Sequence, residues 1–488
     1  MNEEAKFKFL TEIKRLLGPG GFLTECENGK EMIEAFSIDW RRRFFGKPLV
    51  VCLPSTVKEV SNLVCLISKN KELSIVPQGG NTGLSGGGTP DTTSNQVVIS
   101  LKKLDNIKEF DIENKTITVE AGCTLSQIQN TVSKQDLDFA LDFSSRDKAT
   151  VGGVLATNGG GLAVLKHGMA KDLCLGLEVV LPSGKIWNGL RTLRKDNSGY
   201  HLKDLFVGSE GTLGIITTAS LKLINRVQKK HTFVLSTLDV ASALKIFSFL
   251  SKKTYENVTA FEFIEPKAVE IVRRHYPERI PPFINFSREA TICLVEIPEF
   301  FEKDKRFYEK QIAELKETGL CDEYFICDES MTNEIWILRE SITFASAKDG
   351  HQVKNDISLP ISKTVDFIRD VKNELAKIYP DSEIINFGHI GDGNLHFNFS
   401  PFFNRKFTNL SSRHEAHNSF IMENEIFVRK IINDAVMLYG GSITAEHGIG
   451  RLRKSENYRL KDKVEIELMQ KIKNALDPKN IFNPDVLL

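Results

Sequence analysis

The chain has 488 residues, too many for one ordinary hydrophobic core, so two or three domains with ample buried surface are expected. Lys plus Arg and Asp plus Glu both total 64, so no net charge favours binding to nucleic acid or to an anionic membrane. The eight cysteines include no Cys-x-x-Cys pair, which argues against a cysteine-based metal site and favours reduced thiols in a cytosol.

The N-terminal residues predict neither a targeting signal nor a membrane anchor. They carry early acidic residues and lack the apolar core of a secretory signal. No uninterrupted apolar run approaches the length that spans a bilayer, so any membrane contact would be peripheral. We expect a cytoplasmic protein that at most attaches to the surface of the inner membrane.

The first half of the chain is predicted to contain a helical segment and then an α+β domain. Apolar residues recur at helical spacing over 5–18 and end at a Gly-Pro-Gly-Gly run, so 1–45 is a helical segment. Short β-type runs alternate with glycine-rich loops over 46–224, with one helix over 56–69. The β-type runs are 74–76, 97–99, 116–119, 177–181 and 214–217.

A second α+β domain is predicted over 225–430, where the sequence becomes richer in Lys, Glu and Phe. Strand-like runs at 259–263 and 291–295 alternate with longer helical stretches, which indicates an antiparallel sheet covered by helices. The helices are expected near 240–252, 302–317, 333–346 and 361–378. Residues 431–488 are predicted to form a further helical segment.

Two histidines bracket a glycine-rich turn, His389 and His396, and a Glu446-His447 pair follows. Imidazole and carboxylate suit a divalent ion such as zinc, and three protein ligands leave a position open for water or substrate. Strand alternation after the turn would place His396 and Asn398 on one face. His-x6-His matches no standard zinc spacing, so ordinary turn and core histidines are an equal alternative.

Three glycine-rich segments predict a long, phosphate-containing ligand. Six of the ten residues over 79–88 are glycine, and their bare N–H groups can form an anion-binding concavity. No Gly-Lys-Ser/Thr follows and the next element is a strand, so this is neither a P-loop nor a Rossmann fingerprint. Similar segments at 150–161 and 195–214 favour a dinucleotide that crosses all three, with a mobile surface loop as the alternative.

Four motifs together resemble the FAD-linked oxidoreductases of the vanillyl-alcohol oxidase and p-cresol methylhydroxylase superfamily, in the branch that acts on D-2-hydroxy acids. They are Pro-Gln-Gly-Gly-Asn-Thr-Gly at 77–83, Gly-Ser-Glu-Gly-Thr-Leu-Gly at 208–214, Gly-Asp-Gly-Asn-Leu-His at 391–396 and Ala-Glu-His-Gly at 445–448. The resemblance implies an α+β fold with a two-subdomain FAD-binding domain of the p-cresol methylhydroxylase type over 46–224. It also implies a substrate-binding cap domain over 225–430 and an active site completed by 431–488.

The resemblance also implies which residues contact FAD. Some members attach FAD through a histidine in the first loop, but no histidine occurs over 1–166, so non-covalent FAD is expected. The implied FAD-binding residues are Pro77, Gln78, Gly79, Gly80, Asn81, Thr82, Gly83, Ser85, Gly86, Gly152, Gly153, Ala156, Thr157, Asn158, Gly160, Gly161, Gly168, Glu210, Gly211, Gly214, Ile215 and Asn483.

Within this branch, two further runs resemble the D-2-hydroxyglutarate dehydrogenases. They are Trp-Ile-Leu-Arg-Glu-Ser-Ile-Thr at 336–343 and Lys-Asn-Asp-Ile-Ser-Leu-Pro at 354–360. Arg339 and Thr343 would share a helix face, a guanidinium can grip a carboxylate through two N–H bonds, and Lys354 adds a point charge. This set suits a dicarboxylate, although a solvated helix face is the common alternative. Members often have an aromatic residue after that lysine, and here it is Asn355.

The resemblance assigns roles to the histidine motifs. His389, His396 and Glu446 would ligate zinc, Asn398 would hydrogen-bond the substrate, and His447 would be the base for hydride transfer from C2 to flavin N5. Strand neighbours point to opposite faces, so the chain must turn after Glu446 and His447 for both to serve one site.

Several alternatives stay open at this point. A D-lactate dehydrogenase would share the glycine loops and the metal motif but need the distal carboxylate clamp less. Other classes are a His/Glu metallohydrolase and a non-catalytic flavin-binding subunit. For an oxidoreductase of this family, we expect an electron-transfer flavoprotein or a quinone as electron acceptor, and a homodimer.

Overall fold

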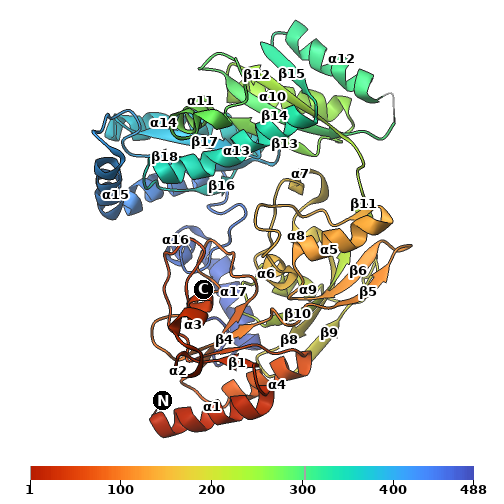
Figure 1. The fold of residues 1–488 in the computed structure, drawn as a ribbon, viewed down its shortest axis with the longest axis vertical. Helices are drawn as coiled ribbons and strands as arrows, with labels where there is room; N and C mark the ends of the chain where they lie inside the picture. The colour runs from red at the N-terminus through yellow and green to blue at the C-terminus, as the bar shows by residue number, and fades with distance from the viewer. Residues whose placement is uncertain (1, 302–303) are drawn as a thin grey trace. The chain divides into compact units, whose positions relative to one another are not determined.

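The computed structural model describes residues 2–301 and 304–488 and contains two compact units. Unit 1 comprises Met1–Arg226 and Glu446–Leu488, and unit 2 comprises Val227–Ala445 (Figure 1). Residues 446–488, most of the C-terminal segment expected over 431–488, therefore belong to unit 1. The helix expected over 302–317 begins on residues 302–303, which lie outside the described residues. Among the described residues, no helix is both long and apolar enough to cross a bilayer.

A mostly parallel sheet forms the first half of unit 1. Its order is β1 (Phe22–Leu23), β2 (Val50–Cys52), β4 (Gln96–Ser100) and β3 (Ser74–Gln78), with β2, β4 and β3 parallel. Helix α4 (Val57–Ile67) connects β2 to β3, and Thr56 caps it because its Oγ1 accepts a hydrogen bond from Glu59 N at 3.1 Å. The other helices here are α1 (Glu3–Leu17), α2 (Glu25–Asn28) and α3 (Lys30–Ser37).

The second half of unit 1 contains a five-stranded antiparallel sheet. Its order is β5 (Ile107–Asp111), β6 (Thr116–Glu120), β10 (Ile215–Lys222), β8 (Cys174–Val180) and β9 (Ile186–Gly189). A two-stranded ribbon joins β7 (Leu137–Asp138) to β11 (Ile224–Asn225). The helices are α5 (Leu125–Val132), α6 (Val151–Ala156), α7 (Val164–His167), α8 (Ala170–Leu173), α9 (Lys203–Phe206), α16 (Lys454–Leu460) and α17 (Lys463–Leu476).

Unit 2 is a seven-stranded sheet with helices packed against it, and every pair of neighbouring strands is antiparallel. The order is β15 (Glu323–Cys327), β12 (Lys230–Thr237), β14 (Thr291–Pro298), β13 (Ala260–Ile264), β17 (Glu383–Gly388), β18 (Asn394–Ser400) and β16 (Asp356–Ser358). The helices are α10 (Val240–Lys253), α11 (Pro266–His275), α12 (Asp304–Glu317), α13 (Glu329–Asp349), α14 (Thr364–Ile378) and α15 (Leu410–Leu438). This architecture confirms the antiparallel sheet and the α+β fold expected from the sequence.

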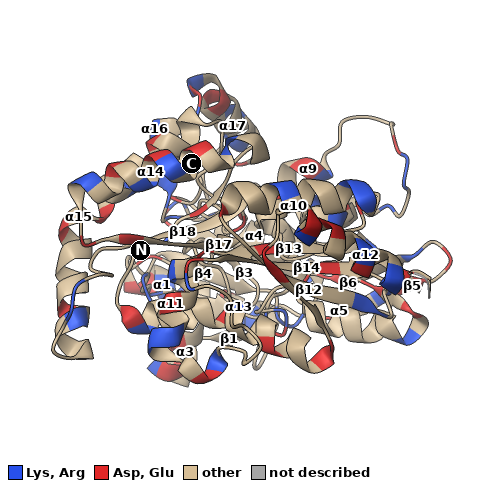
Figure 2. Cartoon of the chain, turned by 90° about the horizontal axis from the view of Figure 1, so that it is seen from above, with Lys and Arg blue, Asp and Glu red and all other residues tan. Residues whose placement is uncertain are grey.

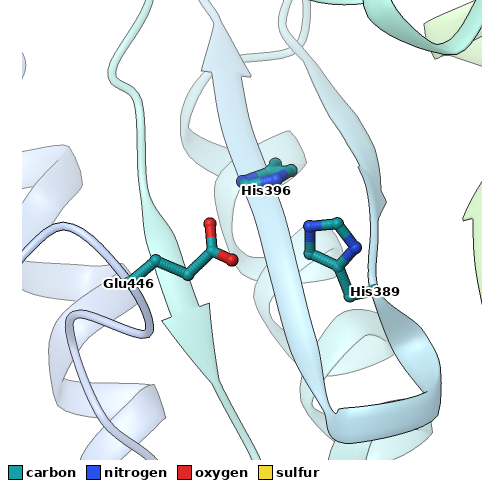
Figure 3. Close-up of side chains that lie close together, drawn as sticks. All are labelled: His389, His396 and Glu446. Carbon is teal, nitrogen blue, oxygen red and sulfur yellow. The ribbon is translucent and has the colours of Figure 1, made fainter. Parts of the chain in front are cut away.

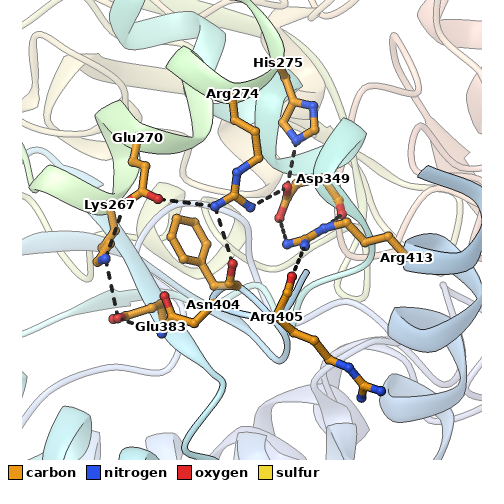
Figure 4. A network of polar contacts seen from close by, with 10 residues as sticks. Lys267, Glu270, Arg274, His275, Asp349, Glu383, Asn404, Arg405 and Arg413 are labelled. Carbon is orange, nitrogen blue, oxygen red and sulfur yellow. Dashed lines mark hydrogen bonds and ion pairs between the residues drawn. The ribbon is translucent and has the colours of Figure 1, made fainter. Parts of the chain in front are cut away.

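A buried carboxylate joins three helices of unit 2 (Figure 4). Asp349, the last residue of α13, is fully buried, and its Oδ1 lies 3.0 Å from Arg274 Nη1 and 2.7 Å from His275 Nε2. Its Oδ2 lies 2.5 Å from Arg413 Nη2 on α15. Burial alone would raise the pKa of Asp349, but the His275 hydrogen bond and the two arginine charges lower it to about 2. This ion-pair network holds α11, α13 and α15 together.

Charged side chains of both signs are interspersed along the helices. Figure 2 shows Lys and Arg alternating with Asp and Glu on helix α14. The local pattern therefore agrees with the zero net charge of the whole chain.

Candidate functional site

A cavity in unit 1 is enclosed by the three glycine-rich segments identified in the sequence. The first segment leaves the end of β3, where Gln78 Nε2 donates hydrogen bonds to Phe36 O at 3.0 Å and Gly88 O at 2.7 Å. The bond to Gly88 joins the two ends of the loop, and the bond to Phe36 ties the loop to α3. The second segment runs through α6, and the third precedes β10, so strands and a helix position all three walls.

Close approach of the backbone explains the glycines in the first loop. A Cβ at Gly80 would lie 1.8 Å from Lys148 O, and one at Gly79 would lie 2.2 Å from Thr150 Oγ1. A Cβ at Gly83 would have no neighbouring atom within 4 Å. The loop thus packs tightly against the second segment on one side and presents bare backbone on another.

Unsatisfied polar atoms in the cavity wall fit a polar ligand. Gln78 Oε1, Thr89 Oγ1 and Thr150 Oγ1 are buried and have no hydrogen-bond partner within the described ranges. Buried polar atoms normally have a partner, and leaving one without costs about 1–3 kcal/mol. The ribityl, pyrophosphate and flavin groups of FAD carry the donors and acceptors that would complete these bonds, so the residues present fit this cofactor.

Most of the residues expected to contact FAD line this cavity, and three do not. Asn483 lies behind the wall, where its Nδ2 donates to Gly87 O at 2.9 Å and to Glu210 O at 2.7 Å. Asn158 accepts a hydrogen bond from Lys171 N at 2.9 Å. Gly168 has a φ of 77° and forms a turn. These three residues shape the loops around the cavity.

The cavity also has lining residues that were not anticipated from the sequence. Phe143, Ser144 and Ser145 form part of the wall, as do Leu101 and Ile216. None of them lies in one of the glycine clusters that drew attention to the loops. Only the packing of distant segments brings them to the cavity, so no local sequence signal could have identified them.

The loop that carries His447 is held against the glycine-rich wall of unit 1. Ser85 Oγ donates to His447 O at 2.9 Å, and the Glu210 carboxylate accepts hydrogen bonds from Ile449 N at 2.8 Å and Gly450 N at 2.7 Å. Burial raises the pKa of Glu210, and the two N–H donors offset part of the rise. Gly448 adopts a φ of 73°, which provides the turn required after His447. Glu446 and His447 both line the cavity.

The two histidines of the metal motif lie next to each other in the sheet of unit 2. His389 directly follows β17, His396 lies on β18, and their ring centroids are 5.7 Å apart. The turn between the two strands contains Gly393 in the left-handed region, where a Cβ would lie 2.2 Å from Leu359 O. The hairpin therefore brings together two imidazoles that the sequence separates by six residues.

Glu446 directly follows Ala445, the last residue of unit 2, whose N–H donates to Asp356 O at 3.1 Å. One potential ligand atom from each of His389, His396 and Glu446 lies within 4.8 Å of the others (Figure 3). Two imidazoles and one carboxylate form a donor set that suits zinc.

Asp356 is a further acidic residue beside the histidines, and it was not among the residues expected to bind metal. It is the cross-strand partner of His396, and its Oδ1 lies 3.7 Å from His396 Nδ1. Asp356, Glu446 and His447 also form a group whose potential ligand atoms lie within 4.8 Å of one another. The pairing of β16 with β18 places Asp356 there, a relation that residue spacing does not reveal.

The proposed carboxylate-binding residues occupy different environments in unit 2. Arg339 is buried on α13, with its Nε 2.7 Å from Glu262 Oε2 and its guanidinium over the Phe387 ring at 4.7 Å. Thr343 is exposed one turn further along the helix, and Lys354 is half-buried before β16.

Asn355 and Asn398 connect neighbouring strands. The backbone N–H of Asn355 donates to Asn398 Oδ1 at 3.2 Å, while the Asn355 side chain donates to Val353 O and Phe397 O. Asn355 is thus a buried structural amide at the position where family members often carry an aromatic ring. Asn398 lies two residues after His396 on β18, as the strand alternation predicts.

Comparisons with known proteins identify the family of this chain. Residues 226–487 match the family "FAD linked oxidases, C-terminal domain", and residues 48–189 match "FAD binding domain". A rice (Oryza sativa subsp. japonica) protein named probable mitochondrial D-2-hydroxyglutarate dehydrogenase is 32% identical over 96% of this chain and 80% of its own length. A Schizosaccharomyces pombe protein named putative mitochondrial D-lactate dehydrogenase is 33% identical over 99% of this chain and 91% of its own length.

A solved structure of p-cresol methylhydroxylase with substrate bound has the same fold. Its TM-score is 0.71 at 15% identity, and the match covers 99% of this chain and 97% of that chain. This likeness confirms the superfamily fold inferred from the motifs. With family matches that span most of its length, the chain belongs to the FAD-linked oxidases and is an FAD-dependent dehydrogenase.

Proposed function

We propose that the enzyme oxidises a D-2-hydroxy acid, specifically D-2-hydroxyglutarate to 2-oxoglutarate. The observation that carries this proposal is the placement of Arg339 beside His389: both side chains contact the same buried carboxylate, Glu262. A cation suited to a second carboxylate is therefore adjacent to a candidate metal ligand. The name of the rice relative supports the same substrate.

The unit 1 cavity would hold FAD without a covalent bond. The first loop carries Asn81, whose Nδ2 donates to Ala35 O at 3.1 Å and Ile38 O at 2.8 Å, and it contains no histidine. When bound, FAD would accept the hydride from C2 of the substrate. The glycine-rich backbone and the partnerless Thr150 hydroxyl would bind its polar groups.

His389, His396 and Glu446 would hold a divalent ion, which we infer to be zinc. Bound there, the ion would lower the pKa of the substrate hydroxyl. Asp356 Oδ1 lies 3.7 Å from His396 Nδ1, so a carboxylate stands beside this proposed metal ligand.

His447 would take the proton from the 2-hydroxyl. An imidazole suits this task near neutral pH, because its ordinary pKa lies close to 6.5. Ser85 donates to the His447 carbonyl, and Glu210 accepts hydrogen bonds from Ile449 N and Gly450 N, so the backbone at and after His447 is held in place. Arg339, Thr343 and Lys354 would bind the distal carboxylate, with Asn398 donating a hydrogen bond to the substrate.

Anaerobic titration of the FAD-loaded enzyme tests this proposal. D-2-hydroxyglutarate should bleach the flavin absorbance, its L-enantiomer should not, and chelation should abolish the response. His447→Ala should slow the reduction by about 10²–10⁴-fold, the usual contribution of a general base. His201→Ala, at an exposed histidine, is the matched control. Full activity of the metal-free enzyme would contradict the role given to His389 and His396.

The same titration separates the alternatives. Bleaching by D-lactate alone would favour a D-lactate dehydrogenase, the activity named for the Schizosaccharomyces pombe relative. Ester or amide hydrolysis without flavin reduction would favour a metallohydrolase. A protein that binds FAD but responds to no 2-hydroxy acid would be a flavin-binding subunit.

The acceptor, assembly and location are proposals from family membership. We propose that the electron acceptor is an electron-transfer flavoprotein or a quinone and that the protein forms a homodimer. We also propose a cytoplasmic location, with attachment at most to the surface of the inner membrane. Stopped-flow reoxidation of the reduced flavin by each acceptor, sedimentation and cell fractionation test these three points. Both relatives described above are named as mitochondrial, so fractionation should include that compartment.

A further inference from the structure

Glu262 is a buried carboxylate that contacts two residues of the proposed site. It lies on β13 with 1% of its surface exposed. Its Oε2 lies 2.7 Å from Arg339 Nε, and its Oε1 is hydrogen-bonded to His389 Nδ1. Each carboxylate oxygen thus binds one functional side chain. Neither the glycine motifs nor the histidine motifs include this residue.

The backbone of unit 2 places these three side chains together. Strand β13 pairs with β17, with Phe263 opposite Gly388, so Glu262 in the middle of β13 lies next to His389, which directly follows β17. Arg339 arrives from α13, and the Phe387 ring supports its guanidinium at 4.7 Å. A carboxylate this deeply buried is tolerated only when cations and hydrogen bonds compensate its lost hydration.

The bonds to Glu262 determine which atoms of its partners face the substrate. With Nδ1 of His389 hydrogen-bonded to Glu262, Nε2 is the ring nitrogen that would ligate a metal ion. With Nε of Arg339 engaged, Nη1 and Nη2 form the edge of the guanidinium that remains for a bidentate carboxylate. One side chain therefore orients the groups proposed to bind both ends of a dicarboxylate.

We propose that Glu262 is a positioning residue that sets the separation between the metal-binding end and the carboxylate-binding end of the substrate pocket. This inference rests on the proposed function. Because a single rigid carboxylate spaces His389 from Arg339, it selects substrates by the length of the chain between their two polar ends. For the proposed substrate D-2-hydroxyglutarate, a shorter diacid or a monoacid would lose the second contact.

Two substitutions at Glu262 test the proposal in the FAD-loaded enzyme. Glu262→Gln removes the charge but keeps the length, and Glu262→Asp keeps the charge but shortens the reach by one methylene. Metal affinity is measured by zinc titration against a chromophoric chelator, and kcat and KM are measured for D-2-hydroxyglutarate, D-malate and D-lactate. We expect Glu262→Gln to weaken zinc binding by about 10–100-fold, the usual effect of removing a hydrogen-bond partner from a ligating histidine.

Length selection is tested by the substrate series. Glu262→Asp should lower kcat/KM for D-2-hydroxyglutarate more than for D-malate, while kcat/KM for D-lactate, which has no distal carboxylate, should change least. The matched control is Glu296→Gln on the adjacent strand β14, where a buried glutamate accepts a bond from Trp336 Nε1 at 2.9 Å. It should leave zinc affinity and substrate preference unchanged.

The outcomes separate this inference from the proposed function. Wild-type protein that ignores every 2-hydroxy acid would overturn both. An active wild-type enzyme whose Glu262→Gln variant keeps its zinc affinity, and whose Glu262→Asp variant keeps its substrate preference, would overturn the positioning role alone. Since Glu262→Asp retains the buried charge pair, it preserves a folded protein for the comparison if Glu262→Gln does not fold.

Discussion

Asp349 and Glu262 are two of the buried carboxylates of unit 2, and both contact basic side chains but have different roles. Burial alone would raise the pKa of each, but the charges and hydrogen bonds of their partners lower it to about 2. The partners of Asp349 join three helices and lie in no proposed site (Figure 4). The partners of Glu262 are the candidate metal ligand His389 and the candidate substrate ligand Arg339. A low pKa therefore shows that a buried carboxylate is paired with basic groups, but it does not show whether the pair is structural or functional. That distinction depends on whether the paired groups belong to a proposed site.

The largest effect that would separate the two networks is on stability. Asp349→Asn leaves Arg413, itself buried, without its counter-charge, so the free energy of unfolding should fall by about 3–5 kcal/mol. Guanidinium denaturation measures this loss. Flavin reduction per folded molecule should stay at the wild-type rate. A stable Asp349→Asn variant that has lost activity would show that Asp349 contributes to the active site, which would contradict its purely structural role.

The next effect is on substrate binding. Arg339→Lys keeps the charge near Glu262 but removes the planar fork, so kcat/KM for D-2-hydroxyglutarate should fall by the equivalent of about 1.5–3 kcal/mol. Steady-state kinetics measure this fall. The kcat/KM for D-lactate should change little. The control Arg369→Lys, on the exposed face of α14, should leave kcat/KM for both substrates unchanged. Equal losses for the two substrates would show that Arg339 acts on structure and not on the distal carboxylate.

A smaller effect is the dependence of stability on pH. The folded pKa of Asp349 is about 2, below its ordinary 3.8, so the unfolded chain takes up the proton first. Its stabilising contribution is present above about pH 4 and is lost as the pH falls through about 2. Asp349→Asn should remove up to about 1.4 kcal/mol per pH unit from the acid slope in this window. Denaturant titrations of the wild type and of Asp349→Asn from pH 5 to about 2 measure how the free energy of unfolding of each protein changes with pH. Identical slopes for the two proteins would contradict the assigned pairing.

The smallest effect is expected at the edge of the Asp349 network. Arg274 has a side chain that is 31% exposed, and its loss leaves His275 and Arg413 on the carboxylate. Arg274→Lys should therefore lower the free energy of unfolding by about 0–1 kcal/mol, as is usual for a partly exposed ion pair. Thermal unfolding measures the change. A loss as large as that of Asp349→Asn would identify Arg274 as the principal partner.

Local patterns in the sequence predicted much of the fold. Short β-type runs identified strands such as 74–76 and 291–295, and the helix expected over 56–69 is α4 in the structure. Strand alternation after the turn also predicted that His396 and Asn398 share a face. These signals are readable because each depends on residues a few positions apart, where backbone geometry fixes which side chains share a face.

The sequence by itself determined the chemistry available to this protein: glycine-rich loops for a dinucleotide, and imidazoles and a carboxylate suited to a metal ion. Only the tertiary structure decided which groups meet. It brought Asp356 opposite His396 by strand pairing, placed Phe143 in the flavin cavity, and joined Glu262 to Arg339 across 77 positions of sequence. Such contacts depend on the packing of whole elements, and a residue's local sequence carries no record of a partner that distant.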